Sequence, residues 1–335
     1  MNTASLPARP GRPIVVVGSL NMDLIIRTPR MPIGGETLTG SGFATLPGGK
    51  GANQAVACAR LGSAVRMIGR VGNDAFGKQL RNGLAADGIN VRDVRRSSAA
   101  ATGIAMILVD EDGQNRIILS PGANGELSEK DVAAHAKVIR EAAMLVVQLE
   151  IPLPTVAKCV AIAHQAGVPV LLNPGPAKPL PPELLANVDI IVPNESEASL
   201  LTGIEITDRK SATAAAKALF ALGVKSVLVT LGADGVMIVD HQGARHQRAN
   251  KINAVDTTAA GDTFIGGLAT GLVEGMILDQ AVWLGQQASA LCVQRHGAQP
   301  NTGGINHVEE NPAVHGCRTA LDSGRHGPWR RIGRR

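Results

Sequence analysis

Apolar runs of strand length alternate with segments of helical period along most of the chain. The strand-length runs are 14–18, 65–71, 144–149, 168–172, 188–192 and 226–231, and helical periodicity marks 52–61, 131–140, 153–166, 260–273 and 278–293. Strands and helices that alternate in this way build a mainly parallel sheet with helices on both faces. We therefore predict an α/β fold, in which ligands bind beyond the carboxyl ends of the strands.

Two segments break this alternation. Residues 25–46 are rich in Gly and Thr, and residues 102–119 have the pattern of two short strands joined by the turn Asp110-Glu111-Asp112-Gly113. We predict that both belong to a small inserted β-sheet, formed by residues of about 20–46 and 98–122. Such a sheet would act as a lid over a binding site.

The two ends of the chain differ from its body. Residues 1–13 precede the first predicted strand, and residues 301–335 contain six Gly, six Arg and three of the eight His without a sustained apolar period. We expect a flexible N-terminal tail, one organised domain at 14–300 and a disordered Gly- and Arg-rich C-terminal tail. The irregular spacing of the three tail histidines argues against a metal cluster.

The positive charge is concentrated in these two tails. The net charge is +5, but the tails hold eight of the 33 Lys and Arg and three of the 28 Asp and Glu, which leaves 25 of each in the body. Aromatic residues make up 2% of the chain and Tyr is absent, so the stacking surfaces of single-strand or RNA binders are lacking. Nucleic acid is therefore not expected as a partner.

Composition also bears on where the protein works. No stretch of about 18 consecutive apolar residues is present, and the apolar run at 14–17 is too short for a signal peptide. The four cysteines lie far apart without a C-x-x-C pair, which argues for reduced thiols and against zinc or disulfides. We expect a soluble cytoplasmic protein with no membrane partner.

The first candidate binding motif is Gly18-Ser-Leu-Asn21-Met-Asp23, directly after the first strand. In an extended chain, Asn21 and Asp23 point to the same side and offer an amide and a carboxylate to a polyhydroxy ligand. An Asx turn that caps the strand explains the same residues equally well.

The second motif is the glycine-rich run Pro47-Gly-Gly-Lys50-Gly-Ala-Asn53-Gln54 at the start of a predicted helix. Its glycines allow close backbone approach to a ligand, while Lys50 and Asn53 supply donors at the helix N-terminus. No Ser or Thr follows Lys50, and the segment after Gly18 does not match G-x-G-x-x-G. These departures argue against a P-loop and against a nicotinamide-dependent dehydrogenase.

The third motif, Asp256-Thr-Thr-Ala-Ala-Gly-Asp262, precedes and opens a predicted helix. Its small residues leave backbone N–H groups exposed at the positive end of the helix, which suits the charge of a transferring phosphoryl group. Asp262 could then act as general base toward a substrate hydroxyl. An Asp N-cap is the alternative, but a single cap explains one carboxylate and not both Asp256 and Asp262.

These motifs, with Pro193-Asn194-Glu-Ser-Glu197, resemble in order and spacing the ribokinase and phosphofructokinase-B family of sugar kinases, from about residue 14 to 300. The resemblance implies a ribokinase-like, Rossmann-like three-layer α/β/α fold with a β-sheet lid. It further implies ATP-dependent phosphorylation of D-ribose at O5, giving D-ribose 5-phosphate and ADP, by a homodimer that pairs through the lid.

The resemblance also implies a role for each motif residue. Asp262 would be the general base, and Ala259, Ala260 and Gly261 would form the anion hole. The sugar-binding positions would be Asn21, Asp23, Gly49, Lys50, Asn53, Glu150 and Asp262. The ATP-binding positions would be Asn194, Thr230, Leu231, Gly232, Ala233, Asp234, Gly235, Gly261 and Gln286.

Two cations are implied as cofactors. Asn194 and Glu197 would organise Mg²⁺ and the phosphates, although the residues alone would make them caps of the next helix. An activating K⁺ would lie at Asp256, Thr258, Cys292, Arg295, Gly297 and Asn301. The chain departs from the family in having Asn301 where Ser is usual, Gln286 where an adenine-contacting Asn is usual, and a Gly- and Arg-rich end in place of a capping helix.

Two alternatives remain open. One is another sugar or nucleoside kinase of the same family, although Phe43 is the only aromatic residue on the expected lid and could stack few bases. The other is a sugar or nucleotide sensor without catalytic activity, against which the intact Gly261 and Asp262 argue.

Overall fold

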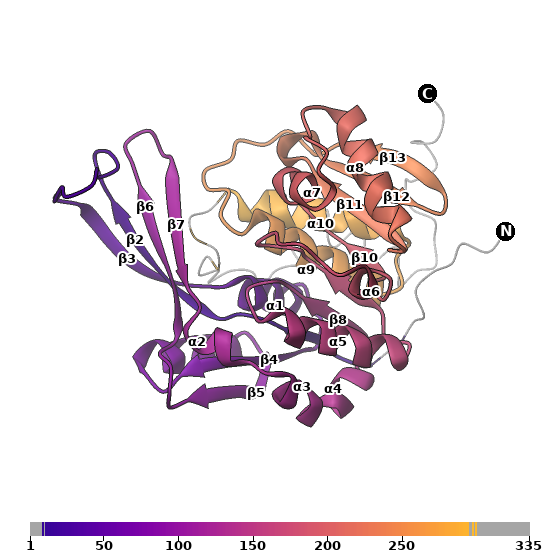
Figure 1. Ribbon diagram of the computed structural model, residues 1–335, viewed down its shortest axis with the longest axis horizontal. Helices are drawn as coiled ribbons and strands as arrows, with labels where there is room; N and C mark the ends of the chain where they lie inside the picture. The colour runs from indigo at the N-terminus through magenta and orange to yellow at the C-terminus, as the bar shows by residue number, and fades with distance from the viewer. Residues whose placement is uncertain (1–8, 10, 295–296, 298, 300–335) are drawn as a thin grey trace. The chain divides into compact units, whose positions relative to one another are not determined.

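The computed structural model describes residues 9, 11–294, 297 and 299, and its main feature is a nine-stranded sheet (Figure 1). The strand order is β13-β12-β11-β10-β9-β8-β1-β4-β5. In chain order the strands are β1 (Ile14–Val17), β4 (Val65–Gly72), β5 (Asn90–Ser97), β8 (Met144–Val147), β9 (Val170–Leu172), β10 (Ile190–Ile191), β11 (Ser226–Thr230), β12 (Val236–Asp240) and β13 (Gly243–Gln247). Neighbouring strands are parallel except at the β11–β12–β13 edge, which is antiparallel.

Strand β1 shows why both faces of this sheet are covered. Its four residues, Ile-Val-Val-Val, have no exposed surface. Val15 and Val17 pack into one hydrophobic cluster, whereas Ile14 and Val16 pack into another. Because successive side chains of a strand point to opposite faces, an unbroken apolar run requires a layer of helices on each side.

In the described part of the chain, ten α-helices supply these two layers. Those on the face of Val15 and Val17 are α3 (Glu129–Ala134), α4 (Ala136–Arg140), α5 (Leu153–Gln165), α6 (Pro182–Leu185), α7 (Glu195–Thr202) and α8 (Arg209–Ala221). Those on the other face are α1 (Lys50–Arg60), α2 (Ala75–Ala86), α9 (Ala260–Val273) and α10 (Leu278–Cys292). This three-layer arrangement confirms the predicted fold class. Within the described residues, no helix has the length and apolar character needed to cross a membrane.

A second sheet of four strands forms the predicted lid (Figure 1). Its order is β3-β2-β6-β7, with β2 at Asn21–Arg27, β3 at Ser41–Gly48, β6 at Gly103–Val109 and β7 at Asn115–Ser120. Strand β2 follows β1 after only three residues, so Asn21 and Asp23 begin a lid strand at the point where it leaves the main sheet. They occupy alternate positions of β2 and therefore share one face of it.

The strand order also locates the ligand crevice. From β1 the chain moves to β4 and β5 on one side, and later to β8, β9 and β10 on the other side. This change of direction is a topological switch point, where ligands of open α/β sheets bind beyond the strand ends. The segments that leave β1 and β8 lead to predicted site residues: residues 18–20 run into Asn21 and Asp23 of β2, and residues 148–152 contain Glu150.

One predicted element is corrected by the structure. The helix expected at 131–140 is divided at His135 into α3 and α4. His135 Nδ1 lies 2.7 Å from the carbonyl oxygen of Asp131, and its Nε2 lies 3.3 Å from Asp93 Oδ1. The histidine is thus held by contacts outside the helical pattern, which apolar periodicity does not reveal. The expected tail at 301–335 and most of 1–13 lie outside the described residues.

Candidate active site

Three elements bring a charged cluster together at the ends of β1 and β8. Glu150 Oε2 accepts hydrogen bonds from Ser19 Oγ at 2.6 Å, from the Lys50 backbone N–H at 3.1 Å and from Asn21 Nδ2 at 3.4 Å. Asp23 is 8% exposed and lies on the adjoining lid strand. The loop after β8, the start of α1 and strand β2 therefore present two carboxylates, a lysine and an amide to one crevice.

Burial and like charge set the electrostatics of this cluster. Burial first, and then the carboxylates of Glu150 and Asp262, raise the pKa of Asp23 to about 7. Burial also raises the pKa of Glu150. Burial alone would lower the pKa of Lys50, but the carboxylates of Asp262, Glu150 and Glu197 together raise it. Lys50 is thus held as a cation among acids, where it can donate to sugar hydroxyls.

The glycine-rich turn packs tightly against these groups. A Cβ at Gly48 would lie 2.3 Å from Asp23 Oδ2, and Gly49, the N-cap of α1, has a φ of +89°. Only glycine fits this contact and this conformation without strain. The sequence predicts a turn that approaches a ligand. The structure shows that the turn also approaches the strand that holds Asn21 and Asp23.

Asp262 is the third residue of α9, not its N-cap. The N-cap is Ala259, the one non-glycine residue of positive φ (57°) within the described part of the chain. Asp262 is buried, and its two oxygens accept side-chain amide N–H groups from Asn53 at 3.0 Å and from Gln54 at 2.9 Å. The alternative explanation of Asp262 as a helix cap is therefore not what is observed.

Asp256 explains the shape of the loop before α9. Its Oδ1 accepts the N–H of Thr258 at 2.8 Å, and its Oδ2 accepts the N–H of Gly297 at 2.9 Å. Cys292 Sγ lies 3.8 Å from the carbonyl oxygen of Thr258. Asp256 thus ties the loop to the segment after α10. Two further predicted members of that site, Arg295 and Asn301, lie outside the described residues.

A cavity of about 730 Å³ opens beside the N-terminus of α9. Of the predicted nucleotide-binding positions, those that line it are Thr230, Gly232, Ala233, Gly235, Gly261 and Gln286. Leu231 and Asp234 do not: Leu231 is buried in the core, and the Asp234 carboxylate pairs with Arg209. Lys251, which the sequence analysis did not single out, is the only charged side chain among the lining residues.

Asn194 and Glu197 form a capping box at the start of α7. Asn194 Oδ1 accepts the N–H of Glu197 at 2.8 Å, and Glu197 Oε2 accepts the N–H of Asn194 at 2.9 Å. The local interpretation of these residues as caps is therefore correct. Glu197 is nevertheless buried close to Lys50: a Cβ at Gly175 would lie 2.6 Å from Glu197 Oε1 and 3.0 Å from Lys50 Nζ, and the carboxylate raises the pKa of Lys50. Neither residue lines the 730 Å³ cavity.

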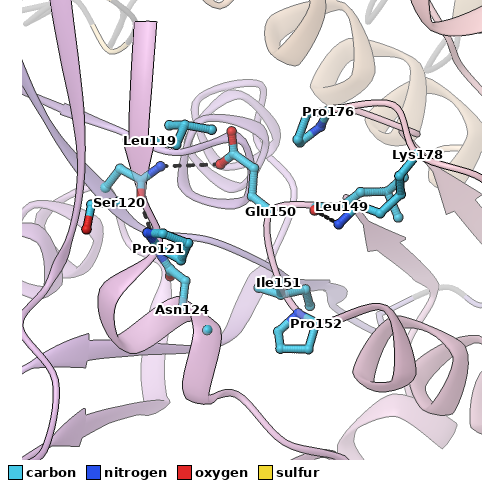
Figure 2. Close-up of a pocket in the computed structure, with 12 residues that line it drawn as sticks. Leu119, Ser120, Pro121, Asn124, Leu149, Glu150, Ile151, Pro152, Pro176 and Lys178 are labelled. Atoms are coloured by element: carbon cyan, nitrogen blue, oxygen red, sulfur yellow. Dashed lines mark hydrogen bonds between the residues drawn. The ribbon is translucent and has the colours of Figure 1, made fainter. Parts of the chain in front are cut away.

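A second cavity, of about 320 Å³, adjoins the charged cluster on the lid side (Figure 2). It shares Asn21 and Glu150 with the cluster, and Figure 2 shows the Glu150 carboxylate between Leu119 of β7 and the loop that carries Lys178. Lys178 Nζ donates to the carbonyl oxygen of Leu149 at 2.7 Å, and burial lowers its pKa. Sequence reasoning missed Lys178, because no motif marks it.

Together these groups can transfer a phosphoryl group to a hydroxyl. A buried carboxylate stands at the positive end of a helix whose first N–H groups lack intrahelical partners, and a Cβ at Gly261 would meet no atom within 4 Å. The open space at Gly261 leaves room for a phosphate there. Among the described residues, no group of three or more His, Cys, Asp or Glu side chains is arranged to hold a metal ion.

Comparison with known proteins gives consistent results. Residues 12–302 match the family described as pfkB family carbohydrate kinase. The chain is 44% identical over 286 residues to a ribokinase of Haemophilus influenzae, covering 85% of this chain and 94% of that protein. It is 36% identical over 298 residues to a deoxyribokinase of Salmonella typhimurium, covering 89% and 97%. The structure of Arabidopsis thaliana ribokinase complexed with ribose and ATP is similar with a TM-score of 0.82, 35% identity and coverage of 90% and 99%.

Proposed function

Because the chain belongs to the pfkB family of carbohydrate kinases, we propose that it transfers the γ-phosphoryl group of ATP to O5 of D-ribose, giving D-ribose 5-phosphate and ADP. The observation that carries the proposal is the position of Asp262, buried beside the open N-terminus of α9 and within the field of Asp23, Glu150 and Lys50. The similar ribokinases, one of them with ribose and ATP bound, support ribose as the acceptor.

In this mechanism the side chains at the lid hinge hold the sugar. Asn21, Asp23, Lys50, Asn53 and Glu150 offer both donors and acceptors, which matches hydroxyls that donate and accept. As O5 attacks the γ-phosphorus, its proton passes to the Asp262 carboxylate. The N–H groups at Ala259 and Gly261 then stabilise the charge that spreads over the phosphoryl oxygens. The N–H of Ala260 donates to the carbonyl oxygen of Thr257 at 3.2 Å in this structure and would join them once that bond is released.

The cavity beside α9 would hold ATP. Thr230, Gly232, Ala233 and Gly235 line one part of it and Gln286 another, so the nucleotide would extend from this loop to the anion hole. Mg²⁺ bound with ATP would supply charge neutralisation at the phosphates. Asn194 and Glu197 would organise it indirectly, because neither lines the cavity.

Potassium activation is part of the proposal. The donors that would hold the cation are the Asp256 carboxylate, which now accepts the backbone N–H groups of Thr258 and Gly297, and backbone carbonyl oxygens such as that of Thr258, and oxygen ligands suit a hard cation. Asp256 already ties these two segments together. A cation there would stiffen the loop that ends in Ala259, and with it the anion hole.

The lid would close over the sugar and pair with the lid of a second copy. Exposed apolar side chains on it support such a contact: Phe43 is 65% exposed, Ile117 53% and Ile118 67%. Apolar surface of this kind on a protein that functions in water marks an interface. Sedimentation analysis would test the dimer, and Ile118→Lys should shift it toward the monomer.

ADP release by the purified protein tests the function. It would be measured with ATP and Mg²⁺ in the presence of ribose, deoxyribose, fructose, adenosine or no acceptor, each with and without K⁺. Turnover that depends on ribose and rises with K⁺ is expected. Preference for deoxyribose, the substrate named for one relative, would keep the mechanism but change the substrate. The absence of turnover with every acceptor would favour a sensor.

A further inference from the structure

Behind the proposed general base lies a network of three buried amide side chains that the mechanism above does not use. Gln54 and Gln148 have no exposed surface, and Asn173 is 6% exposed. Gln54 Nε2 donates to Asp262 Oδ1 at 2.9 Å and to Asn173 Oδ1 at 3.3 Å, and Gln148 Nε2 donates to Gln54 Oε1 at 2.6 Å. The three residues come from α1 and from the loops after β8 and β9.

The chemistry of the partners fixes the direction of every bond in this network. A carboxylate can only accept, and Asn173 must present its oxygen because its Nδ2 donates to the carbonyl oxygen of Val192 at 3.0 Å. Gln54 must therefore turn its NH₂ group toward both. Its oxygen then faces Gln148, which must donate in turn. The orientation of the chain of amides thus follows from the acceptors that Gln54 faces, the Asp262 carboxylate and the Asn173 carbonyl oxygen.

This arrangement leaves one group unsatisfied. Gln148 Oε1 is buried and has no hydrogen-bond partner among the described residues. A Cβ at Gly18 would lie 1.9 Å from it, so the surrounding backbone leaves little space there. An unpaired buried acceptor lowers stability, and an apolar side chain of the same shape would avoid that loss. The network is better explained by what it does to Asp262 than by its contribution to folding.

We propose that Gln54 is a positioning residue for Asp262, and that Gln148 and Asn173 fix the Gln54 amide in the orientation this requires. Asn53 holds Oδ2 of the same carboxylate, so Gln54 and Asn53 together prevent it from rotating away from the substrate hydroxyl. Gln54 is not among the residues assigned to the sugar or to ATP. This inference rests on the proposed function of Asp262.

The first test is Gln54→Met, which keeps the length of the side chain but removes its donor. We expect kcat to fall by about 10- to 100-fold, as for a misplaced catalytic group. The KM values for ribose and ATP should stay within about twofold. Gln54→Glu should lower kcat further, because it places a second carboxylate against Asp262 Oδ1. A role in folding alone would lower the melting temperature and leave kcat of the folded protein unchanged.

A double-mutant cycle separates positioning from general damage. If Gln54 acts through the Asp262 carboxylate, Gln54→Met should cause little further loss in an Asp262→Asn background. The control is Thr155→Val, since Thr155 is equally buried and donates to the carbonyl oxygen of Leu127 at 2.6 Å in another part of the molecule. It should lower stability and leave kcat unchanged.

Each variant is judged by comparing its turnover with that of the unaltered protein. If that protein releases ADP with ribose but Gln54→Met keeps kcat within twofold, or loses the same factor in both backgrounds, the inference is wrong and the proposed function stands. If the unaltered protein shows no turnover with any acceptor, both are wrong. Should Gln54→Met fail to fold, Gln148→Met replaces it. It removes the donor to Gln54 Oε1, and an unchanged kcat would overturn the inference.

Discussion

The two sides of the crevice differ in the kind of residue that lines them. On the proposed sugar side the ligand would meet charged side chains: Glu150 helps to raise the pKa values of Asp23 and Lys50, and Lys50 opposes the rise in the pKa of Glu150 that burial causes. On the nucleotide side, the cavity is lined largely by small and apolar residues and by backbone, and Lys251 is the only charged side chain among them. Under the proposed function, one side would recognise its ligand through charge and hydrogen bonds and the other mainly through shape.

This difference suggests where specificity lies. A site built from buried polar groups rejects an analogue that leaves one of them unpaired, because the unpaired group keeps its desolvation penalty. A cavity lined by backbone and small side chains has fewer such groups and discriminates less by this route. Substitutions on the sugar side should therefore act selectively on the sugar, and Asp262 should affect the chemical step more than either ligand.

The largest effect is expected from Asp262→Asn. The amide cannot accept the O5 proton, so kcat should fall by about 10² to 10⁴-fold, the share of general-base catalysis. The substitution preserves shape, and ribose affinity measured by calorimetry should change little. Turnover close to that of the unaltered protein would remove Asp262 from its assigned role.

Asp23→Ala should separate the two sides most clearly. The alanine removes an acceptor for the sugar hydroxyls, and a hydrogen bond to a charged group contributes about 1.5–3 kcal/mol, or roughly 10- to 100-fold in KM for ribose. The KM for ATP should change by less than about twofold. Steady-state kinetics with each substrate varied in turn would check this, and equal effects on both KM values would place Asp23 outside the sugar site.

The sequence allows the fold to be predicted where local pattern and tertiary structure agree. The unbroken apolar run of β1 indicated a strand buried on both faces, and the predicted helix at 260–273 matches α9 from end to end. The antiparallel β12–β13 edge and the break at His135 were missed. Neither leaves a periodic signal, because strand order and a single side-chain contact are tertiary features.

Site residues could be predicted from sequence only where they fall within short motifs. Asn53 and Lys50 belong to such a run, and so does Gln54, which directly follows Asn53 but was given no role. Its partners Gln148 and Asn173 lie far along the chain, after two other strands. No spacing relates these three positions, so the amide network becomes visible only in the folded chain.

The pH dependence of sugar binding sharpens the comparison further. Because the pKa of Asp23 is raised to about 7, only about a tenth of it is ionised at pH 6, and KM for ribose should be about tenfold higher there than at pH 8. KM for ATP should follow the titration of ATP itself.

The free energy of unfolding responds to pH in the opposite direction to sugar binding. The folded state binds this proton more tightly than the unfolded state, so the contribution of Asp23 falls as pH rises from 3.8 to about 7.

A KM for ribose that does not change between pH 6 and 8, in the unaltered protein as in Asp23→Asn, would contradict this assignment. Asp23→Asn is the matched control because its amide does not titrate. If the unaltered protein shows the pH dependence and Asp23→Asn abolishes it, the titrating group is identified.

The smallest effect concerns the nucleotide side, where Gly261→Ala should separate stability from activity. An added Cβ at Gly261 meets no protein atom within 4 Å, and alanine is favoured over glycine in a helix by about 0.5–1 kcal/mol, so the melting temperature of the free protein should rise slightly. The same methyl group would project into the space assigned to the transferring phosphoryl group. We expect kcat to fall a few-fold and KM for ribose to remain unchanged. The control is Gly83→Ala in α2, where a Cβ is equally free of contacts, and it should raise stability without lowering kcat. Equal kcat values for the two variants would show that the space at Gly261 is not the phosphoryl site.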